Sequence, residues 1–301
     1  MKTSLRLLAT LGLAAISAPS LAALNVLACE PEWGALVNEI AGDKANVYVA
    51  TTAQQDPHHI QARPALIARA RSADLVVCTG AELEVGWLPL LLSQGANPKI
   101  QVGQPGYFEA ARQVALLEVP RALDRSLGDV HAAGNPHIQL DPRNIAKVAD
   151  ALTERMAQIA PGDGETFRTR NRDFQGRWRD AIKRWEALAA PLKGMPIVVY
   201  HKNMSYLEAW LGLRQLGTLE PLPGIPPTPS HLADLITKLR ADPAKAIVYA
   251  AYQNPQSARF VAERVKVPVV ELPFTVGGDD RAKNLFGLFD DTIARLLEAQ
   301  Q

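Results

Sequence analysis

Three turns in this chain place a histidine where a metal ion could be bound. Residues 56–59 read Asp-Pro-His-His and follow a β-branched run, and residues 135–137 read Asn-Pro-His. His201 directly follows the apolar run 196–200. A proline keeps the preceding residue extended, so His58 lies on a turn and not inside a helix. Turns at the carboxyl ends of strands are where open α/β sheets bind ligands, and imidazole is a common metal ligand.

The spacing of these histidines does not by itself define a site. His137 lies 79 residues after His58 and 64 residues before His201. Zinc fingers and helical zinc motifs space their ligands by only a few residues. Only tertiary structure can bring these three together, and any one of them alone is more simply explained as a surface or hydrogen-bonded histidine.

The elements that must position these turns alternate between apolar strands and amphipathic helices. This alternation predicts an α/β fold with mainly parallel sheets covered by helices on both faces. We expect strands at 24–28, 46–52, 74–78, 196–200, 246–249 and 269–273, and helices at 33–41, 64–72, 82–92, 142–160, 163–190, 204–211, 231–239, 255–265 and 285–297. The pattern predicts an N-terminal lobe over 24–160, a long rigid linking helix over 161–192 and a similar C-terminal lobe over 193–301.

The N-terminus has the composition of a secretory signal peptide. Residues 1–22 combine a basic start, an apolar centre and small residues at the end. We expect cleavage after Ala22, which changes the net charge of +1 to −1 by removing Lys2 and Arg6. No cysteine stands at the expected cleavage point, so the prediction is a soluble periplasmic protein and not a lipoprotein. The near-neutral charge gives no indication of nucleic-acid binding.

The two cysteines, Cys29 and Cys78, each end an apolar strand-like run. Export permits a disulfide between them. Two buried, reduced cysteines on neighbouring strands fit the sequence equally well, so both alternatives stay open.

Taken together, the three histidine turns resemble those of the metal-binding solute-binding proteins of zinc and manganese ABC transporters (the cluster A-I family). The resemblance covers essentially the whole chain after the signal peptide, including the long connecting helix and the segments 73–76, 79–80 and 83–84. Within that family the chain is most similar to the AztC type, which has a modest loop where ZnuA-type proteins have a long loop rich in His and Asp.

The resemblance implies a ligand set. By position, His58, His137 and His201 correspond to metal ligands, with His59 as the alternate to His58. A histidine at the third position is typical of zinc-type members. Many members carry an aspartate soon after the last strand, and here the first carboxylates in that place follow a Gly-Gly pair. Asp279 is therefore the expected fourth ligand, with Asp280 or a water molecule as the alternatives.

Two further histidines have less defined roles. His131 lies in a loop rich in Gly, Ala, Asp and Ser, where it could serve as an auxiliary capture residue or as an ordinary exposed side chain. His231 follows Pro-Ser at the expected start of a helix and reads as a structural residue.

The resemblance implies a periplasmic protein that binds Zn²⁺ as its transported ligand and delivers it to a membrane ABC permease. We expect a monomer that is not an enzyme and that could receive zinc from a periplasmic chaperone. Three alternatives are weighed against this: a secreted zinc hydrolase with a His₃-water site, a manganese-type member of the same family, and a binding protein for a siderophore or corrinoid. The sequence offers no evident general base beside the histidine turns, and the histidine set disfavours an organic ligand.

Overall fold

The computed structural model describes residues 23–120, 128 and 131–301, so the predicted signal peptide at 1–22 lies outside the described residues. The strands are β1 (Leu24–Ala28), β2 (Ala45–Val49), β3 (Leu75–Cys78), β4 (Tyr107–Glu109), β5 (Pro196–Val199), β6 (Arg214–Thr218), β7 (Ala246–Ala250) and β8 (Val269–Leu272). The helices are α1 (Pro31–Ala41), α2 (Pro64–Ser72), α3 (Leu88–Gly95), α4 (Pro142–Ile159), α5 (Gly164–Leu188), α6 (Ser205–Leu211), α7 (Pro229–Ala241), α8 (Gln256–Val265) and α9 (Leu285–Gln300).

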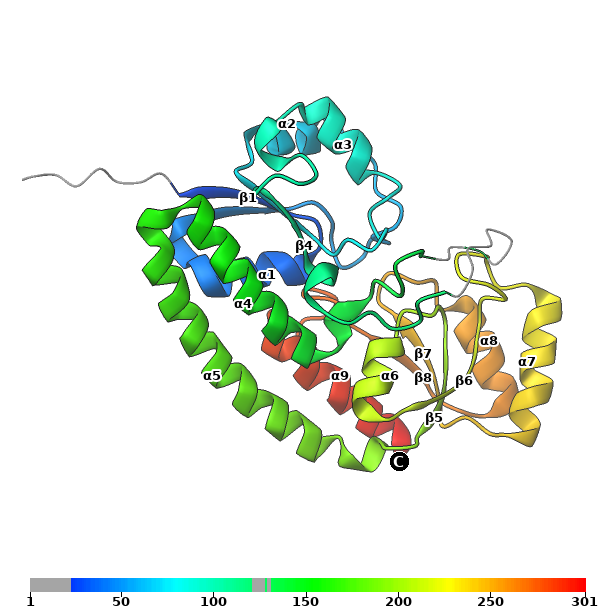
Figure 1. Ribbon diagram of the computed structural model, residues 1–301. Helices are drawn as coiled ribbons and strands as arrows, with labels where there is room; N and C mark the ends of the chain where they lie inside the picture. The colour runs from blue at the N-terminus through cyan, green and yellow to red at the C-terminus, as the bar shows by residue number, and fades with distance from the viewer. Residues whose placement is uncertain (1–22, 121–127, 129–130) are drawn as a thin grey trace, which may run out of the picture.

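The strands form two parallel four-stranded sheets with the same topology. The first has the order β2-β1-β3-β4 and the second the order β6-β5-β7-β8. Each sheet belongs to one lobe, and helices cover the sheets (Figure 1). The predicted α/β fold with two similar lobes is confirmed. None of the described helices is both long enough and apolar enough to cross a membrane.

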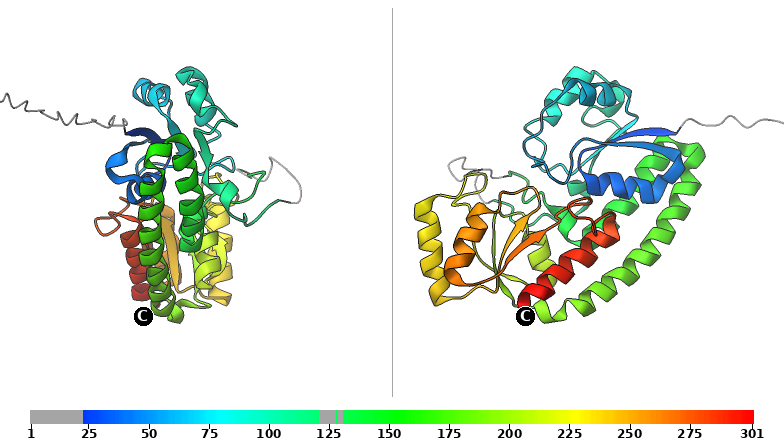
Figure 2. Two further views of the ribbon diagram at one scale, coloured as in Figure 1. Left: turned by 60° about the vertical axis from the view of Figure 1, so that its left-hand side comes forward. Right: turned by 180° about the vertical axis from the view of Figure 1, so that it is seen from behind.

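The 25-residue helix α5 runs along one side of both lobes (Figures 1 and 2). Its buried side chains recur at helical spacing, as expected of a helix with one apolar face: they include Phe167, Phe174, Trp178 and Trp185. The ring of Trp185 lies 5.0 Å from that of Phe289 in α9 (centroid to centroid), while Arg177 pairs with Glu39 in α1 at 2.8 Å. This helix is therefore packed against both lobes, and the lobe boundaries near 160 and 193 stay a prediction.

A single core of buried side chains extends through both lobes. It includes Leu24 and Trp33 near the start of the chain and Leu288 and Leu296 in α9. Smaller separate cores lie on the outer face of each sheet. The shared core therefore joins the two lobes, and it extends to Phe274, whose ring lies 5.9 Å from that of His137.

The structure joins Cys29 and Cys78 by a disulfide, with their Cα atoms 4.8 Å apart. The bridge lies where β1 and β3 end, beside a buried carboxylate cluster that sequence analysis did not predict. Glu84 accepts the backbone N–H groups of Thr79 (2.7 Å) and Gly80 (3.0 Å). Burial, followed by the neighbouring charge of Glu84, raises the pKa of Glu30 well above its ordinary value.

Three elements differ from the prediction. The helix expected over 82–92 begins only at Leu88, because Ala81 and Glu82 have φ values of 50° and 67° and form turns. Strands β4 and β6 were not predicted; β4 is three residues long, and β6 has the sequence RQLGT, which lacks an apolar run. Both are edge strands, where burial imposes less of a pattern.

Candidate metal centre

The three histidines are carried by turns from different parts of the chain. His58 lies between β2 and α2, and His201 directly follows the turn that ends β5. His137 precedes a short 3-10 helix, Ile138–Leu140, that leads into α4. His58 and His201 therefore follow strands, and His137 ends the loop that the sequence predicts before the 142–160 helix.

The structure brings these histidines together in the space between the lobes. Their ring centroids lie 5.4 Å (His58–His137), 5.8 Å (His58–His201) and 5.6 Å (His137–His201) apart. One ring nitrogen from each lies within 4.8 Å of the others. His137 and His201 are buried, and only 11% of the His58 side chain is exposed. Ligands around tetrahedral zinc are about 3.3 Å apart, so a small closure would satisfy such a site.

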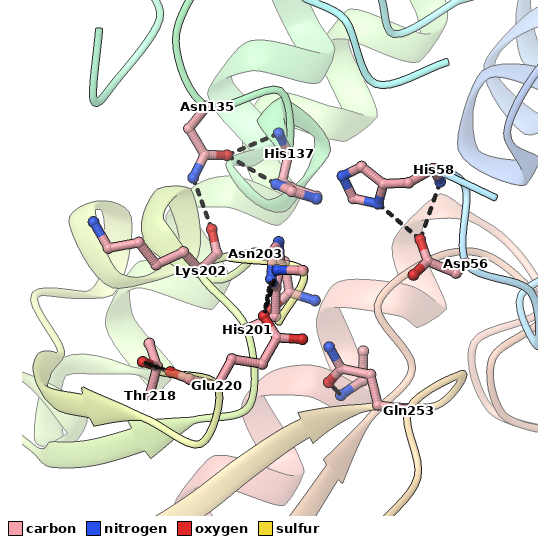
Figure 3. Close-up of polar contacts among 12 residues, drawn as sticks. Asp56, His58, Asn135, His137, His201, Lys202, Asn203, Thr218, Glu220 and Gln253 are labelled. Atoms are coloured by element: carbon pink, nitrogen blue, oxygen red, sulfur yellow. Dashed lines mark hydrogen bonds and ion pairs between the residues drawn. The ribbon is translucent and has the colours of Figure 1, made fainter. Parts of the chain in front are cut away.

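Each of the three rings has its Nδ1 atom engaged by a side-chain oxygen (Figure 3). The partners are Asp56 Oδ1 for His58 at 2.7 Å, Asn135 Oδ1 for His137 at 2.9 Å and Glu220 Oε2 for His201 at 2.7 Å. These oxygens accept a hydrogen bond from the Nδ1–H group, which leaves the lone pair of Nε2 free. Hydrogen bonds of this kind fix the tautomer of metal-binding histidines.

With Nδ1 engaged in each ring, Nε2 is the nitrogen left for an ion. The Nε2 atoms of His58 and His137 are buried without a hydrogen-bond partner among the described residues. A buried polar atom that lacks a partner is costly unless something binds it. Two bare nitrogens on rings 5.4 Å apart are therefore well placed to bind an ion.

The electrostatics keep the site ready for a cation. Burial lowers the pKa of His137 well below its ordinary value, and the neighbouring His58, His201 and His131 lower it further. Its imidazole is thus neutral, as a metal ligand must be. Burial opposes ionisation of Asp56, but hydrogen bonds from His58 outweigh it and lower the pKa of that carboxyl.

Two cavities flank the cluster. One of 110 Å³ is lined by His131, His137 and His201. The other, of 200 Å³, is lined by His58, His201 and Glu220. An ion could reach the cluster from either side.

The other three histidines are not among the three clustered ligand candidates. The His131 ring lies 5.4 Å from that of His58 and 6.5 Å from that of His137, beside the cluster. His59 is exposed, and its ring lies 6.1 Å from that of His58. His231, at the start of α7, has a structural contact: its Nε2 atom forms a hydrogen bond with the Thr218 carbonyl oxygen at 2.8 Å.

The two predicted aspartates lie outside the three-histidine group in the described chain. Asp279 forms an ion pair with Arg295 and accepts the Arg281 N–H at 2.7 Å. The hydrogen bond from Arg281 is the largest cause of the lowered pKa of Asp279. Asp280 is exposed.

The Gly-Gly pair before these aspartates closes a tight turn. Gly277 has a φ of 87°, and its N–H donates to the Ala282 carbonyl at 2.7 Å. A Cβ atom on Gly278 would lie 2.0 Å from the Pro273 carbonyl oxygen. In this structure the glycines permit close backbone packing; they do not fold the loop inward to the histidines.

Sequence reasoning missed the residues that orient the rings, although a signal existed for two of them. Asp56 and Asn135 each stand two residues before a ligand candidate, and each accepts both the backbone N–H and the Nδ1 of that histidine. The repeated Asx-Pro-His pattern encodes this turn. Glu220 lies 19 residues from His201 and carried no such signal.

Known proteins share the sequence pattern and the fold of this chain. A family model, ZnuA, described as zinc-uptake complex component A, periplasmic, matches residues 26–299. The chain belongs to this family. It is an exported substrate-binding component of a metal ABC transporter and not an enzyme.

Individual relatives are distant. The high-affinity zinc uptake system protein ZnuA of Yersinia pestis is 25% identical over 223 residues, which are 70% of each chain. The manganese ABC transporter substrate-binding lipoprotein scaA of Streptococcus gordonii is 26% identical over 172 residues, 54% of this chain and 52% of that protein. A crystal structure of ZnuA has the same fold, with a TM-score of 0.75, 19% identity and coverage of 91% of this chain and 99% of that one. Membership of the AztC type stays a prediction.

Proposed function

We propose that this protein captures Zn²⁺ in the space between its lobes and delivers it to an ABC permease for import. The observation that carries the proposal is the convergence of three imidazoles whose Nδ1 atoms are all engaged, so that Nε2 is the nitrogen left to bind an ion. Imidazole donors suit Zn²⁺, whereas Mn²⁺ prefers oxygen ligands. The zinc-uptake relative from Yersinia pestis supports the same cargo.

The proposed ligands are His58, His137 and His201. Asp279 stays the proposed fourth ligand, because a carboxylate offsets part of the charge of the ion and a fourth imidazole does not. Zinc binding then requires Asp279 to leave Arg295, which keeps its pairing with Asp291. Partly exposed ion pairs are worth only about 0–1 kcal/mol, so breaking this pair costs little.

His131 is the alternative for the fourth position, because its ring lies only 5.4 Å from that of His58 (centroid to centroid). Delivery to a permease, a monomeric state and supply by a periplasmic chaperone are part of the proposal. Removal of a signal peptide after Ala22 also stays a prediction.

Metal binding to the purified protein tests the proposal. Equilibrium dialysis at pH 7.5 should show one tightly bound Zn²⁺ that excess Mn²⁺ does not displace. At pH 5.0 the affinity should fall steeply, because ligand imidazoles, whose ordinary pKa is about 6.5, must be deprotonated. An affinity that is the same at both pH values would exclude a three-histidine site.

Two substitutions locate the site. His137→Ala should weaken zinc binding by more than the roughly 10- to 100-fold typical of changes to the residues that support metal ligands. His231→Ala is the matched control, because His231 bonds the Thr218 carbonyl away from the cluster. Equal losses in the two variants would refute the assignment.

A further inference from the structure

One of the three ring-orienting residues is itself held in place. Asp56 and Glu220 are carboxylates that present only oxygen to their histidines, but Asn135 has an amide with an oxygen end and a nitrogen end. Its Oδ1 faces His137, so its Nδ2 must find acceptors elsewhere. The orientation of this buried amide decides which kind of partner His137 meets.

Three acceptors surround the Nδ2 atom of Asn135 (Figure 3 shows the second). They are Glu118 Oε2 at 2.9 Å, the Lys202 carbonyl oxygen at 2.7 Å and Ser205 Oγ at 3.3 Å. A flipped amide would direct its oxygen at the Glu118 carboxylate and the Lys202 carbonyl, which repel it. Glu118 is the charged member of this set, and a charged acceptor forms the stronger hydrogen bond.

The flip matters for metal binding. With Oδ1 towards the ring, His137 carries its proton on Nδ1 and leaves Nε2 bare. With Nδ2 towards the ring, Nδ1 would have to accept, and the proton would move to Nε2. A protonated Nε2 cannot bind a metal ion.

Other contacts hold the Glu118 carboxylate beside Asn135. Its Oε1 atom pairs with Lys202 Nζ at 3.0 Å, and Lys202 adjoins the ligand candidate His201. Although 38% of the Glu118 side chain is exposed, its Oε2 also accepts from Ser205 Oγ at 3.2 Å. The backbone of Glu118 is held at a φ of 53°, a conformation that residues other than glycine rarely adopt.

The turn that carries His137 has a separate support. The Tyr206 hydroxyl donates to the Asn135 carbonyl at 2.8 Å and accepts the Leu117 N–H at 3.0 Å. Loss of the Glu118 carboxylate would therefore remove the charged acceptor of the Asn135 amide and leave the weaker pair, the Lys202 carbonyl and Ser205 Oγ, while the backbone of the turn stays anchored.

We propose that Glu118 is a positioning residue for metal binding, which acts through Asn135 to hold the His137 proton on Nδ1. The inference deepens the proposed zinc site and rests on it. Glu118 makes no contact with the ion; its role is to select the ring tautomer that can bind one.

Four proteins test this: wild type, Glu118→Ala, Glu118→Gln and the control Glu154→Ala. Glutamine keeps an acceptor for Asn135, whereas alanine removes it. Glu154 pairs with Arg168 at 2.7 Å on the exposed face of α4 and α5, so its variant loses an ion pair without touching the site. Zinc affinity is measured by competition with a chromophoric chelator, and ring tautomers of the metal-free proteins by nitrogen-15 NMR of labelled histidines.

The expected result is a loss of about 10- to 100-fold in zinc affinity for Glu118→Ala. Glu118→Gln should recover most of that affinity, and Glu154→Ala should match wild type. In the metal-free wild type His137 should carry its proton on Nδ1, and in Glu118→Ala a fraction should carry it on Nε2.

Three outcomes would overturn the inference: unchanged affinity and tautomer in Glu118→Ala, equal losses for alanine and glutamine, or a wild-type His137 protonated on Nε2. The last measurement needs no variant, so it can refute the inference even if Glu118→Ala fails to fold. In that case Glu118→Gln, which should keep the wild-type tautomer and most of the affinity, supplies the comparison. A wild type that binds no zinc but shows the expected tautomers would refute the proposed function and leave the positioning role intact.

Discussion

Each ligand candidate offers one nitrogen to the site and gives the other to an oxygen acceptor. Two of these acceptors, Asp56 and Glu220, are carboxylates, and the third is the amide of Asn135. Three neutral imidazoles leave the charge of Zn²⁺ uncompensated, and two carboxylates one hydrogen bond further out offset it. The site therefore has electrostatic support before any fourth ligand arrives.

The fourth position can be assigned by comparing neighbouring carboxylates. Asp279→Asn should lower zinc affinity by more than about tenfold, since a coordinating carboxylate is lost. Asp280→Asn is the matched control, because Asp280 is exposed and adjacent in the chain. Chelator competition on both variants gives the comparison.

His131→Ala, measured alongside, completes this test. A smaller loss than that of Asp279→Asn is expected. The reverse order would assign the fourth position to His131, which lies nearer the cluster in this structure.

At this scale the sequence specified the ligand candidates better than their surroundings. His58, His137 and His201 stand in local Pro-His or strand-end contexts that can be recognised within a few residues. Glu118 and Glu220 act through contacts that only the tertiary structure creates. Nothing within a few positions of either residue marks it.

Among the elements, β1 and β3 are tied together at the ends that lead to the site. The disulfide closes a loop with a sequence separation of 49 residues. Both cysteines are fully buried. The bridge restricts the unfolded chain.

Replacing both cysteines by alanine should destabilise the metal-free protein by about 4 kcal/mol, the chain-entropy value for a loop of this length. Zinc affinity should be unchanged, since neither cysteine contacts the histidines. Urea unfolding of the variant and of wild type with and without a reductant measures the effect. Identical midpoints for all three would contradict the bridge.

Helix α1 contributes a second link, this time between the lobes. The hydroxyl of Thr275, which follows β8, donates a hydrogen bond to Glu32 Oε2, with 2.5 Å between the two oxygens. Burial raises the pKa of Glu32 from 4.5 to about 7. Between those two values the folded protein keeps a proton that the unfolded chain has lost, so the contribution of Glu32 to stability is full below pH 4.5 and is lost as the pH rises through 7.

Glu32→Gln should remove this pH dependence. Relative to the variant, wild type should lose about 3 kcal/mol of unfolding free energy between pH 4.5 and pH 8. Urea denaturation of the metal-free proteins at the two pH values measures the difference. Glu39→Gln, on the same helix but in a surface ion pair with Arg177, is the control, and parallel profiles for Glu32→Gln and wild type would refute the effect.

The elements were predictable where burial imposed a pattern. Helix α2 was predicted with its observed bounds, and β1 likewise, because both are bounded by clear signals. The start of α3 was wrong because the Glu84 side chain binds the N–H groups of Thr79 and Gly80 and so stabilises turns in place of a helix. Side chains that capture backbone groups in this way compete with helix formation.

Because one buried core is shared by both lobes, we expect the whole molecule to unfold as one unit. Helix α5 spans ~37 Å, and packs against both lobes along this length. The lobes are thus joined by a rigid, packed helix and not by a flexible linker. Zinc that binds only the folded state must stabilise both of them together.

Thermal unfolding should therefore show one transition that zinc moves upward. Free zinc at about 100 times the dissociation constant should add about 2.7 kcal/mol, and a chelator should reverse the change. His137→Ala should show the same transition without the zinc-dependent shift. Two transitions, of which zinc moves only one, would show that the lobes are energetically separate.

The membership of α9 in the core also bears on how the protein is made. Synthesis delivers the chain from its N-terminus, so Leu24 and Trp33 emerge long before Leu288 and Leu296, with which they share a core. A nascent first lobe must therefore keep apolar surface exposed until the last helix has been produced. The protein should depend on chaperones for most of its synthesis, and a premature stop that deletes only α9 should leave the first lobe prone to aggregation.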